Sequence, residues 1–230
     1  MISILHGDNI LASRHLLQSR IKDFKSKQFE ELKLEGKEIN LTDLIQAIES
    51  KSLLSQNKFL VIENFFSNPS ISLKKQFLEY FFKNKPVIEI ILWEGKLLSG
   101  ETQKKWSKVA KLLEFKISTA IFKFVDSIKP NNAKVMLACL NECLKNEEAE
   151  LIFYMMVRQL RLLILAKDGV NNLSTMPEWM RGKFLRQSQS FTKEELMEIY
   201  KKLLEIDAGQ KTGKAVVPLR TELDFLLSSL

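Results

Sequence analysis

The sequence is poor in the residues on which disulfide frameworks, metal centres and flexible linkers depend. Its 230 residues include two cysteines, two histidines, eight glycines and five prolines. Cys139 and Cys143 fall four residues apart in a helical pattern, so we interpret them as small apolar core residues. A metal site at this pair would need further ligands, and His6 and His15 lie far away in sequence. We therefore expect no metal, no cofactor and a reducing compartment.

Long hydrophobic runs are also missing. The apolar run from Leu151 to Ala166 is shorter than a bilayer span and contains Arg158 and Arg161, which favours a buried helix over a membrane helix. The N-terminus carries no basic leader followed by an apolar segment and a small-residue cleavage site. These features predict a cytoplasmic protein without a membrane partner.

The charge balance is mildly basic. Lysine and arginine number 35 against 28 aspartates and glutamates, a formal net charge of +7, and the two signs are interleaved along most of the chain. This balance suits a protein that works beside nucleic acid, but an ordinary solvated surface gives the same counts. Lys104, Lys105 and Lys108 are candidates for contact with DNA, and a solvated helix face is the alternative interpretation.

Short apolar runs alternate with helical patterns up to about residue 117, which is typical of a parallel sheet covered by helices. The expected strands are 2–5, 29–34, 59–62, 87–93 and 114–116, and the expected helices between them are 10–24, 41–49, 73–82 and 101–112. Beyond Ser118 the pattern is helical: 121–128, 133–144, 148–167, 177–187, 192–213 and 218–230. We predict an α/β domain over residues 1–117 and an all-α domain over residues 118–230.

The last two helices are the most clearly patterned. Thr192 and Glu195 form a capping box at a helix start, and Gly213 suits the end of that helix. Pro218 suits the first turn of the next helix. That helix carries a surplus of apolar residues: Leu219, Leu223, Phe225, Leu226, Leu227 and Leu230. Such a surface must pack on its own domain or on neighbouring subunits.

A phosphate-binding loop is expected after the first strand of many nucleotide-binding α/β proteins, but its residues are missing here. The segment His6-Gly7-Asp8-Asn9 has one glycine, an aspartate that would repel phosphate, and no following Lys-Ser/Thr pair. The segment from Gly209 to Lys214 is no substitute, because Ala215 stands where the hydroxyl is needed. We also find no catalytic constellation, so no intrinsic catalysis is expected.

Several short motifs nevertheless occur in a familiar order. They are Ser52-Leu53-Leu54-Ser55 before Phe59-Leu60-Val61-Ile62, then Ile121-Phe122-Lys123-Phe124-Val125-Asp126, Val157-Arg158-Gln159-Leu160-Arg161-Leu162-Leu163, and Leu204-Glu205-Ile206-Asp207 with Lys211-Thr212-Gly213. Together they resemble the delta subunit of bacterial DNA polymerase III, and the resemblance covers most of the chain.

The resemblance implies a clamp-loader subunit without its own ATPase activity. Its N-terminal domain would be a degenerate RecA-like domain of AAA+ type, and its C-terminal domain a helical collar that assembles with gamma/tau and delta-prime type subunits. In the family, a hydrophobic pair before the third strand inserts into the sliding clamp (beta) and helps to open it for loading onto primed DNA. Leu53 and Leu54 occupy that position. For the collar contacts we expect the residues Arg158, Arg161, Leu219, Leu223, Leu226 and Leu227.

The residues themselves support an exposed position for the leucine pair. Two adjacent leucines cannot both point inward from a regular helix or strand, and Ser52, Ser55 and Gln56 favour a turn. Ordinary core packing is the alternative. The sequence departs from the family in one respect: Lys116 leads almost directly to Ile121, so the small helical lid domain between the two parts is missing. The rival functions are a divergent small NTPase and a basic nucleic-acid-binding protein.

Overall fold

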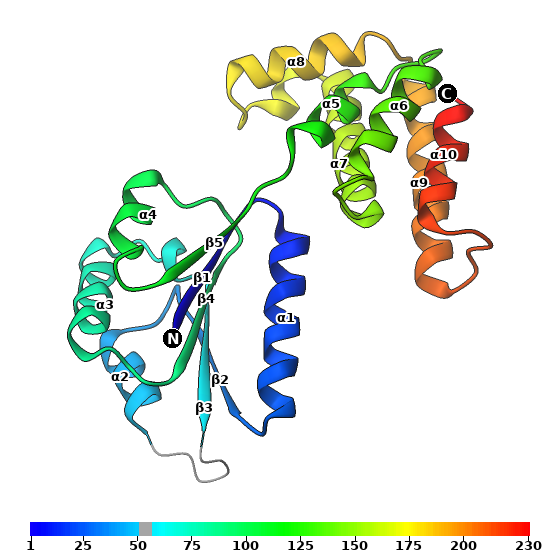
Figure 1. Ribbon diagram of the computed structural model, residues 1–230. Coiled ribbons are helices and arrows are strands. Elements are labelled where there is room, and N and C mark those ends of the chain that lie inside the picture. The colour runs from blue at the N-terminus through cyan, green and yellow to red at the C-terminus, as the bar shows by residue number, and fades with distance from the viewer. Residues whose placement is uncertain (51–56) are drawn as a thin grey trace. The chain divides into compact units, whose positions relative to one another are not determined.

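The computed structural model describes residues 1–50 and 57–230. The chain divides into two compact units, Met1–Ile117 and Ser118–Leu230 (Figure 1). Unit 1 is the α/β part and unit 2 is entirely helical in its regular structure. Across the described ranges, no helix combines the length and the apolar character that a membrane crossing requires.

Unit 1 is built on a five-stranded parallel sheet with the strand order β2-β3-β4-β1-β5. Its elements are β1 (Ile2–Gly7), α1 (Ile10–Ser26), β2 (Glu30–Glu35), α2 (Leu41–Glu49), β3 (Lys58–Glu63), a 3-10 turn (Phe65–Ser67), α3 (Ile71–Asn84), β4 (Glu89–Glu94), α4 (Gly100–Trp106) and β5 (Lys111–Phe115). The registers are parallel throughout, and β1 pairs with both β4 and β5.

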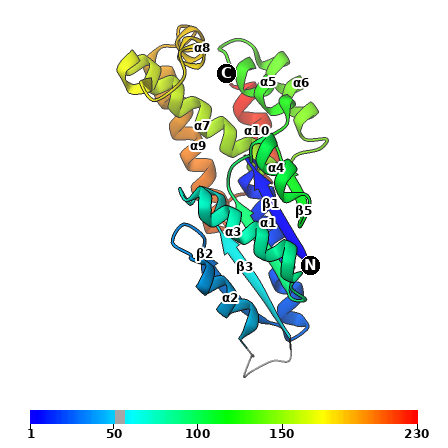
Figure 2. The same ribbon diagram turned by 90° about the vertical axis from the view of Figure 1, so that its left-hand side faces the viewer.

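Helices cover both faces of this sheet, which explains why its central strands are apolar at most positions. Phe59 and Val61 of β3 pack with Leu17 on the face covered by α1. Leu60 and Ile62 point to the other face, where α2, α3 and α4 cover the sheet. Figure 1 shows α1 on one side and the three other helices on the opposite side, and Figure 2 looks onto α2 and α3 in front of the strands.

Unit 2 is organised around α7. Its helices are α5 (Thr119–Ser127), α6 (Ala133–Cys143), α7 (Ala149–Asp168), α8 (Glu178–Ser188), α9 (Lys193–Thr212) and α10 (Leu219–Ser228), with a 3-10 turn at Val170–Leu173. Helix α7 packs against α5, α8, α9 and α10, and its apolar side chains are mostly buried. The predicted capping box of Thr192 and Glu195 is confirmed, and Gly213 ends α9 with a φ of 68°.

The predicted fold class is confirmed: a RecA-like parallel α/β domain is followed by a helical bundle. The expected helix over 101–112 is wrong, because α4 ends at Trp106 and β5 already begins at Lys111. Trp106 packs against the rings of Phe65, Phe66 and Phe81, which fixes the helix end in the core. The chain then turns and pairs with β1, an edge that would otherwise lack a partner.

Two expected strands shift for the same kind of reason. The strand expected at 87–93 is Glu89–Glu94, and Val87 is 97% exposed before it begins. The strand expected at 114–116 is Lys111–Phe115. Strand pairing sets these bounds, since Glu89 pairs with Phe59 of β3, and β5 pairs with β1 from Lys111 to Phe115.

Candidate functional site

The loop between β1 and α1, where a phosphate loop would lie, is closed by hydrogen bonds within the chain. The Gly7 N–H donates to the carbonyl of Lys96 at 3.1 Å, and the Asn9 N–H donates to the carbonyl of Phe115 at 3.1 Å. Gly7 has a φ of +142°, and a Cβ built on it would lie 1.8 Å from the Phe115 oxygen. The Phe115 backbone therefore packs against this loop, and both amides already have acceptors.

The side chains that flank Gly7 are also engaged. Asp8 Oδ1 accepts a hydrogen bond from the Ile117 N–H at 2.9 Å, and Asn9 Oδ1 caps α1 by accepting from the Ala12 N–H at 3.1 Å. His6 is fully buried, and its Nδ1 accepts from the Leu98 N–H at 3.4 Å. Burial lowers the pKa of His6, so the imidazole is neutral at physiological pH. The side chains of His6, Asp8 and Asn9 therefore make structural hydrogen bonds within unit 1.

Carboxylates stand at the ends of β3 and β4, the edge at which open α/β sheets bind ligands. Glu63 is buried and paired with Arg14 at 2.6 Å and with Lys33 at 2.8 Å. Burial alone would raise the pKa of Glu63, but hydrogen bonds and charges from Arg14 and Lys33 outweigh it and lower the pKa below its usual value. Arg14 also lies over the ring of Trp93, 3.5 Å from its centroid.

Glu94 is held in a second network. It is 2% exposed, accepts from the Ser67 N–H at 3.2 Å and from the Ser67 hydroxyl, and lies 3.9 Å from Lys96. Within 1–50 and 57–230, no group of three or more His, Cys, Asp or Glu side chains is arranged to hold a metal ion. The carboxyl edge of the sheet is thus tied by internal ion pairs and hydrogen bonds.

The predicted clamp contact at Leu53 and Leu54 lies outside the described residues. The chain on either side is well anchored. The Lys58 ammonium, at the start of β3, donates to the Ala47 carbonyl at 2.7 Å and to Ser50 at the end of α2. Burial lowers the pKa of Lys58. These bonds join the end of α2 to the start of β3 across the short connection.

The collar residues expected from sequence fall into two groups. Arg158 and Arg161 are exposed on α7, on the same side as Tyr154 and Leu165, which are 58% and 38% exposed. Gln159 between them is buried and bonds the Gln187 side chain, whose Nε2 donates to carbonyls of Val125 and Ile128. The glutamine of this motif therefore joins α7 to α8, where Gln187 in turn bonds α5, while its arginines face outward.

Helix α10 presents a different residue from those expected. Leu223, Leu226 and Leu227 are buried inside unit 2, so they stabilise the unit and cannot meet a partner directly. Leu219 is half-buried. Phe225 is 63% exposed and lines a hollow of about 420 Å³ with Ile206 and Val216, the latter 92% exposed. The exposure of Phe225 could have been predicted, because Phe225 does not follow the helical spacing of the buried leucines. Treating all apolar residues of this helix as one face hides that difference.

The three lysines proposed for DNA contact do not share a helix face. Lys104 and Lys105 lie in the last turn of α4, whereas Lys108 follows the helix. Lys105 is paired with Glu101 at 2.7 Å. The alternative interpretation, one solvated helix face for all three lysines, is wrong because the helix ends at Trp106. Their contact with DNA stays a prediction.

Comparison with known proteins identifies unit 2. Residues 118–227 match the family model described as "DNA polymerase III delta subunit, C-terminal domain". No curated protein sequence matches the chain. Among solved structures, the DNA clamp loader delta protein of Bacillus subtilis is similar at 16% identity, with a TM-score of 0.48, over 99% of this chain and 94% of that one.

A gamma subunit-related protein of DNA polymerase III from Thermotoga maritima is similar at 13% identity, with a TM-score of 0.37, over 99% of this chain and 93% of that one. The family match spans all six helices of unit 2, from the start of α5 to nearly the end of α10. On this match unit 2 is similar to the C-terminal domain of the delta subunit of DNA polymerase III.

Proposed function

We propose that this chain is the delta-type subunit of a clamp loader, which binds the sliding clamp and helps to open it for loading onto primed DNA. The observation that carries the proposal is the match of residues 118–227 to the C-terminal domain of the delta family. The partners would be the clamp and the gamma/tau and delta-prime type subunits, in the cytoplasm. The chain would encounter primed DNA as part of the assembled complex.

Within this proposal, unit 1 contacts the clamp through Leu53 and Leu54. The position of the pair between α2 and β3 supports it. The Lys58 bond to the end of α2 fixes the two points from which this segment leaves and rejoins the fold.

Unit 2 would assemble with the other subunits. The exposed face of α7, with Arg158 and Arg161, and the hollow around Phe225 are the surfaces that support this assignment. The half-buried Leu219 lies at the start of α10. The buried Leu223, Leu226 and Leu227 would act by holding α10 in place.

In this proposal the other loader subunits bind and hydrolyse ATP. Two amides of the β1–α1 loop donate within the chain, and the Glu63 carboxylate is occupied by Arg14 and Lys33. A small NTPase would need these groups for phosphate and magnesium. The geometry of this edge therefore favours the clamp-loader proposal over the NTPase alternative. The net charge of +7 supports the other alternative, a basic nucleic-acid-binding protein.

The test is co-purification with the sliding clamp of the same organism, together with titration calorimetry of the isolated chain. We expect stable clamp binding and no heat from Mg-ATP. Failure to bind the clamp would sink the proposal. Micromolar binding of Mg-ATP would revive the NTPase, and salt-sensitive binding of primed DNA by the chain alone would favour the nucleic-acid-binding alternative.

A further inference from the structure

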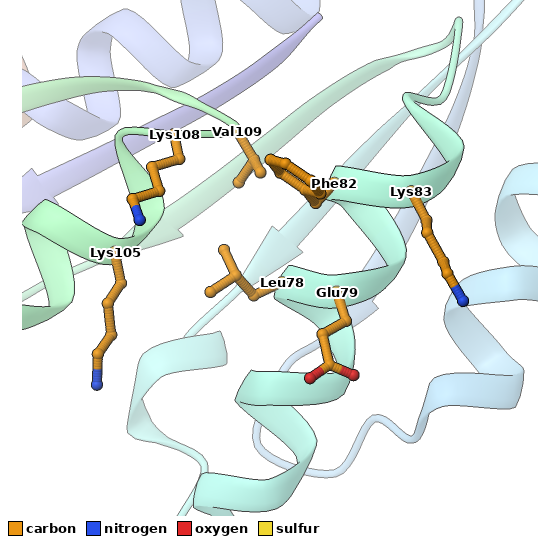
Figure 3. A pocket seen from close by; sticks show the side chains of 7 residues that line it. All are labelled: Leu78, Glu79, Phe82, Lys83, Lys105, Lys108 and Val109. Atoms are coloured by element: carbon orange, nitrogen blue, oxygen red, sulfur yellow. The ribbon is translucent and has the colours of Figure 1, made fainter.

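A groove lies between α3 and the turn that follows α4, on the face of the sheet opposite α1. Its floor is apolar and consists of Leu78, Phe82 and Val109, and its volume is about 500 Å³. Figure 3 shows Phe82 and Val109 side by side with Leu78 below them. Phe82 is 63% exposed, whereas Phe77 and Phe81 of the same helix are buried. This floor can receive one large apolar side chain.

Lysines surround the floor. Lys105 and Lys108 lie on one side of it and Lys83 on the other, as Figure 3 shows. An adjoining hollow of about 830 Å³ shares Phe82 and Lys108 and adds Lys85 and Lys111. One acidic side chain, Glu79, also lines the groove, and Lys105 is paired with Glu101. The rim is therefore predominantly cationic, and the complementary occupant is acidic.

The shape of the groove decides between two kinds of acidic occupant. A single nucleic-acid strand binds along a cationic track with aromatic platforms for successive bases. Here one aromatic ring stands beside two aliphatic side chains, and Glu79 would repel a phosphate next to the floor. A protein segment that inserts one apolar side chain, with carboxylates on either side of it, satisfies both the floor and the rim.

The position of the groove connects it with the proposed clamp contact. The adjoining hollow is lined by Met1 and Ile2 at the start of β1, Pro86 before β4 and Lys111 at the start of β5. Because all strands are parallel, this is the edge at which β3 also begins, at Lys58. A partner that meets the chain next to Lys58 would lie along the same edge.

We propose that the groove of Leu78, Phe82 and Val109, with its rim of Lys83, Lys105 and Lys108, is a second docking site for the sliding clamp. It would take an acidic segment of the clamp that carries one large apolar side chain. This inference rests on the proposed function, since it assigns the segment to the clamp. Two contacts on one edge would resist rotation of the clamp about the first contact.

The test measures the affinity of the full chain for the sliding clamp and for a single-stranded thymidine oligonucleotide. Phe82→Ser removes the exposed ring, and we expect clamp affinity to fall about tenfold to a hundredfold. Lys83→Glu with Lys108→Glu should lower clamp affinity at least about tenfold, with a loss that shrinks as salt is added. Lys129→Glu with Lys134→Glu in unit 2 changes the net charge equally and should leave clamp affinity unaltered.

The outcomes separate the groove from the proposed function. Groove variants that bind the clamp as the wild type does, while Leu53→Ala with Leu54→Ala loses binding, overturn the second site and leave the proposed function standing. A wild-type chain that does not bind the clamp overturns both. Groove variants that lose oligonucleotide affinity by the same factor as clamp affinity assign the lysines to nucleic acid instead. Melting temperatures should stay unchanged, because the three substituted side chains are exposed.

Discussion

Glu63 illustrates how a carboxylate at the end of a strand is held by contacts within the chain. Its carboxylate stands at the end of a central strand, yet Arg14 and Lys33 occupy both oxygens. The missing Lys-Ser/Thr pair after Gly7 is readable from the sequence. The hydrogen bonds donated by the Gly7 and Asn9 amides cannot be predicted from the sequence, because their acceptors, Lys96 and Phe115, are about 90 and 106 residues away in the chain. Such contacts follow from the sheet order and not from local pattern.

We predict that Glu63→Gln destabilises unit 1 in a pH-dependent way. Loss of the charge leaves Arg14 and Lys33 with a weaker acceptor, which should cost about 1–3 kcal/mol at pH 7. The folded pKa of Glu63 lies below 4.5, so its contribution is present above pH 4.5 and is lost as pH falls through the folded value. Urea unfolding from pH 7 to pH 3 should show the two proteins converging below pH 4.5; a constant difference would contradict this.

The leucine pair makes a prediction of its own. Each leucine that enters a partner pocket contributes about 1.5–3 kcal/mol, so Leu53→Ala with Leu54→Ala should weaken clamp binding at least about a hundredfold. The melting temperature should change little, since the side chains serve the partner. Surface plasmon resonance and thermal unfolding provide the two measurements. A large loss of stability with unchanged clamp affinity would assign the pair to the core.

At the scale of elements, sequence periodicity predicts most helices and capping residues. It assigns the wrong element where long-range strand pairing decides the structure. Lys111 and Leu112 continue a helical pattern, and only the open edge of β1 makes them part of a strand. In α10, spacing correctly identifies an apolar helix, yet it does not say which leucines face α7 and which residue faces outward. Burial at Leu223 and exposure at Phe225 depend on how six helices pack, which no local window contains.

Substitutions on the exposed side and on the buried side of α10 should therefore affect assembly and stability, respectively. Phe225→Ser should weaken entry into the loader complex at least about tenfold while stability stays near wild type, because the ring is exposed. Leu227→Ala should lower the unfolding free energy by about 2–5 kcal/mol, because its side chain is buried. Gel filtration of the reconstituted complex and chemical unfolding measure these effects. Equal assembly by both variants would remove Phe225 from the interface.

Truncation of the chain within α8, for example after Lys183, would not provide a clear test of assembly. It would remove α9 and α10 entirely and cut α8 before Gln187, which bonds α5 and α7. Loss of the complex would then report unfolding of unit 2 as readily as loss of a contact. Substitutions at exposed residues keep the two causes apart.

The whole molecule consists of two units joined by very little chain. Strand β5 ends at Phe115 and α5 begins at Thr119, so residues 116–118 are all that connects the sheet to the helical bundle. The lid domain of the resembled family has no place between them. Asp8 accepts from the Ile117 amide, which ties the end of unit 1 to its own β1–α1 loop. The last residue of unit 1 is therefore held by a contact within unit 1.

From this organisation we predict that the two activities separate on cutting the chain after Ile117. Fragment 1–117 contains both covered faces of its sheet and the Asp8 contact to Ile117, so it should fold alone and bind the clamp within about threefold of the full chain, the spread expected for independent sites. Fragment 118–230 should enter the complex with gamma/tau and delta-prime type subunits and should not bind the clamp. Circular dichroism establishes folding, and binding is measured for both fragments. A folded fragment 1–117 with no clamp affinity would move the clamp contact into unit 2.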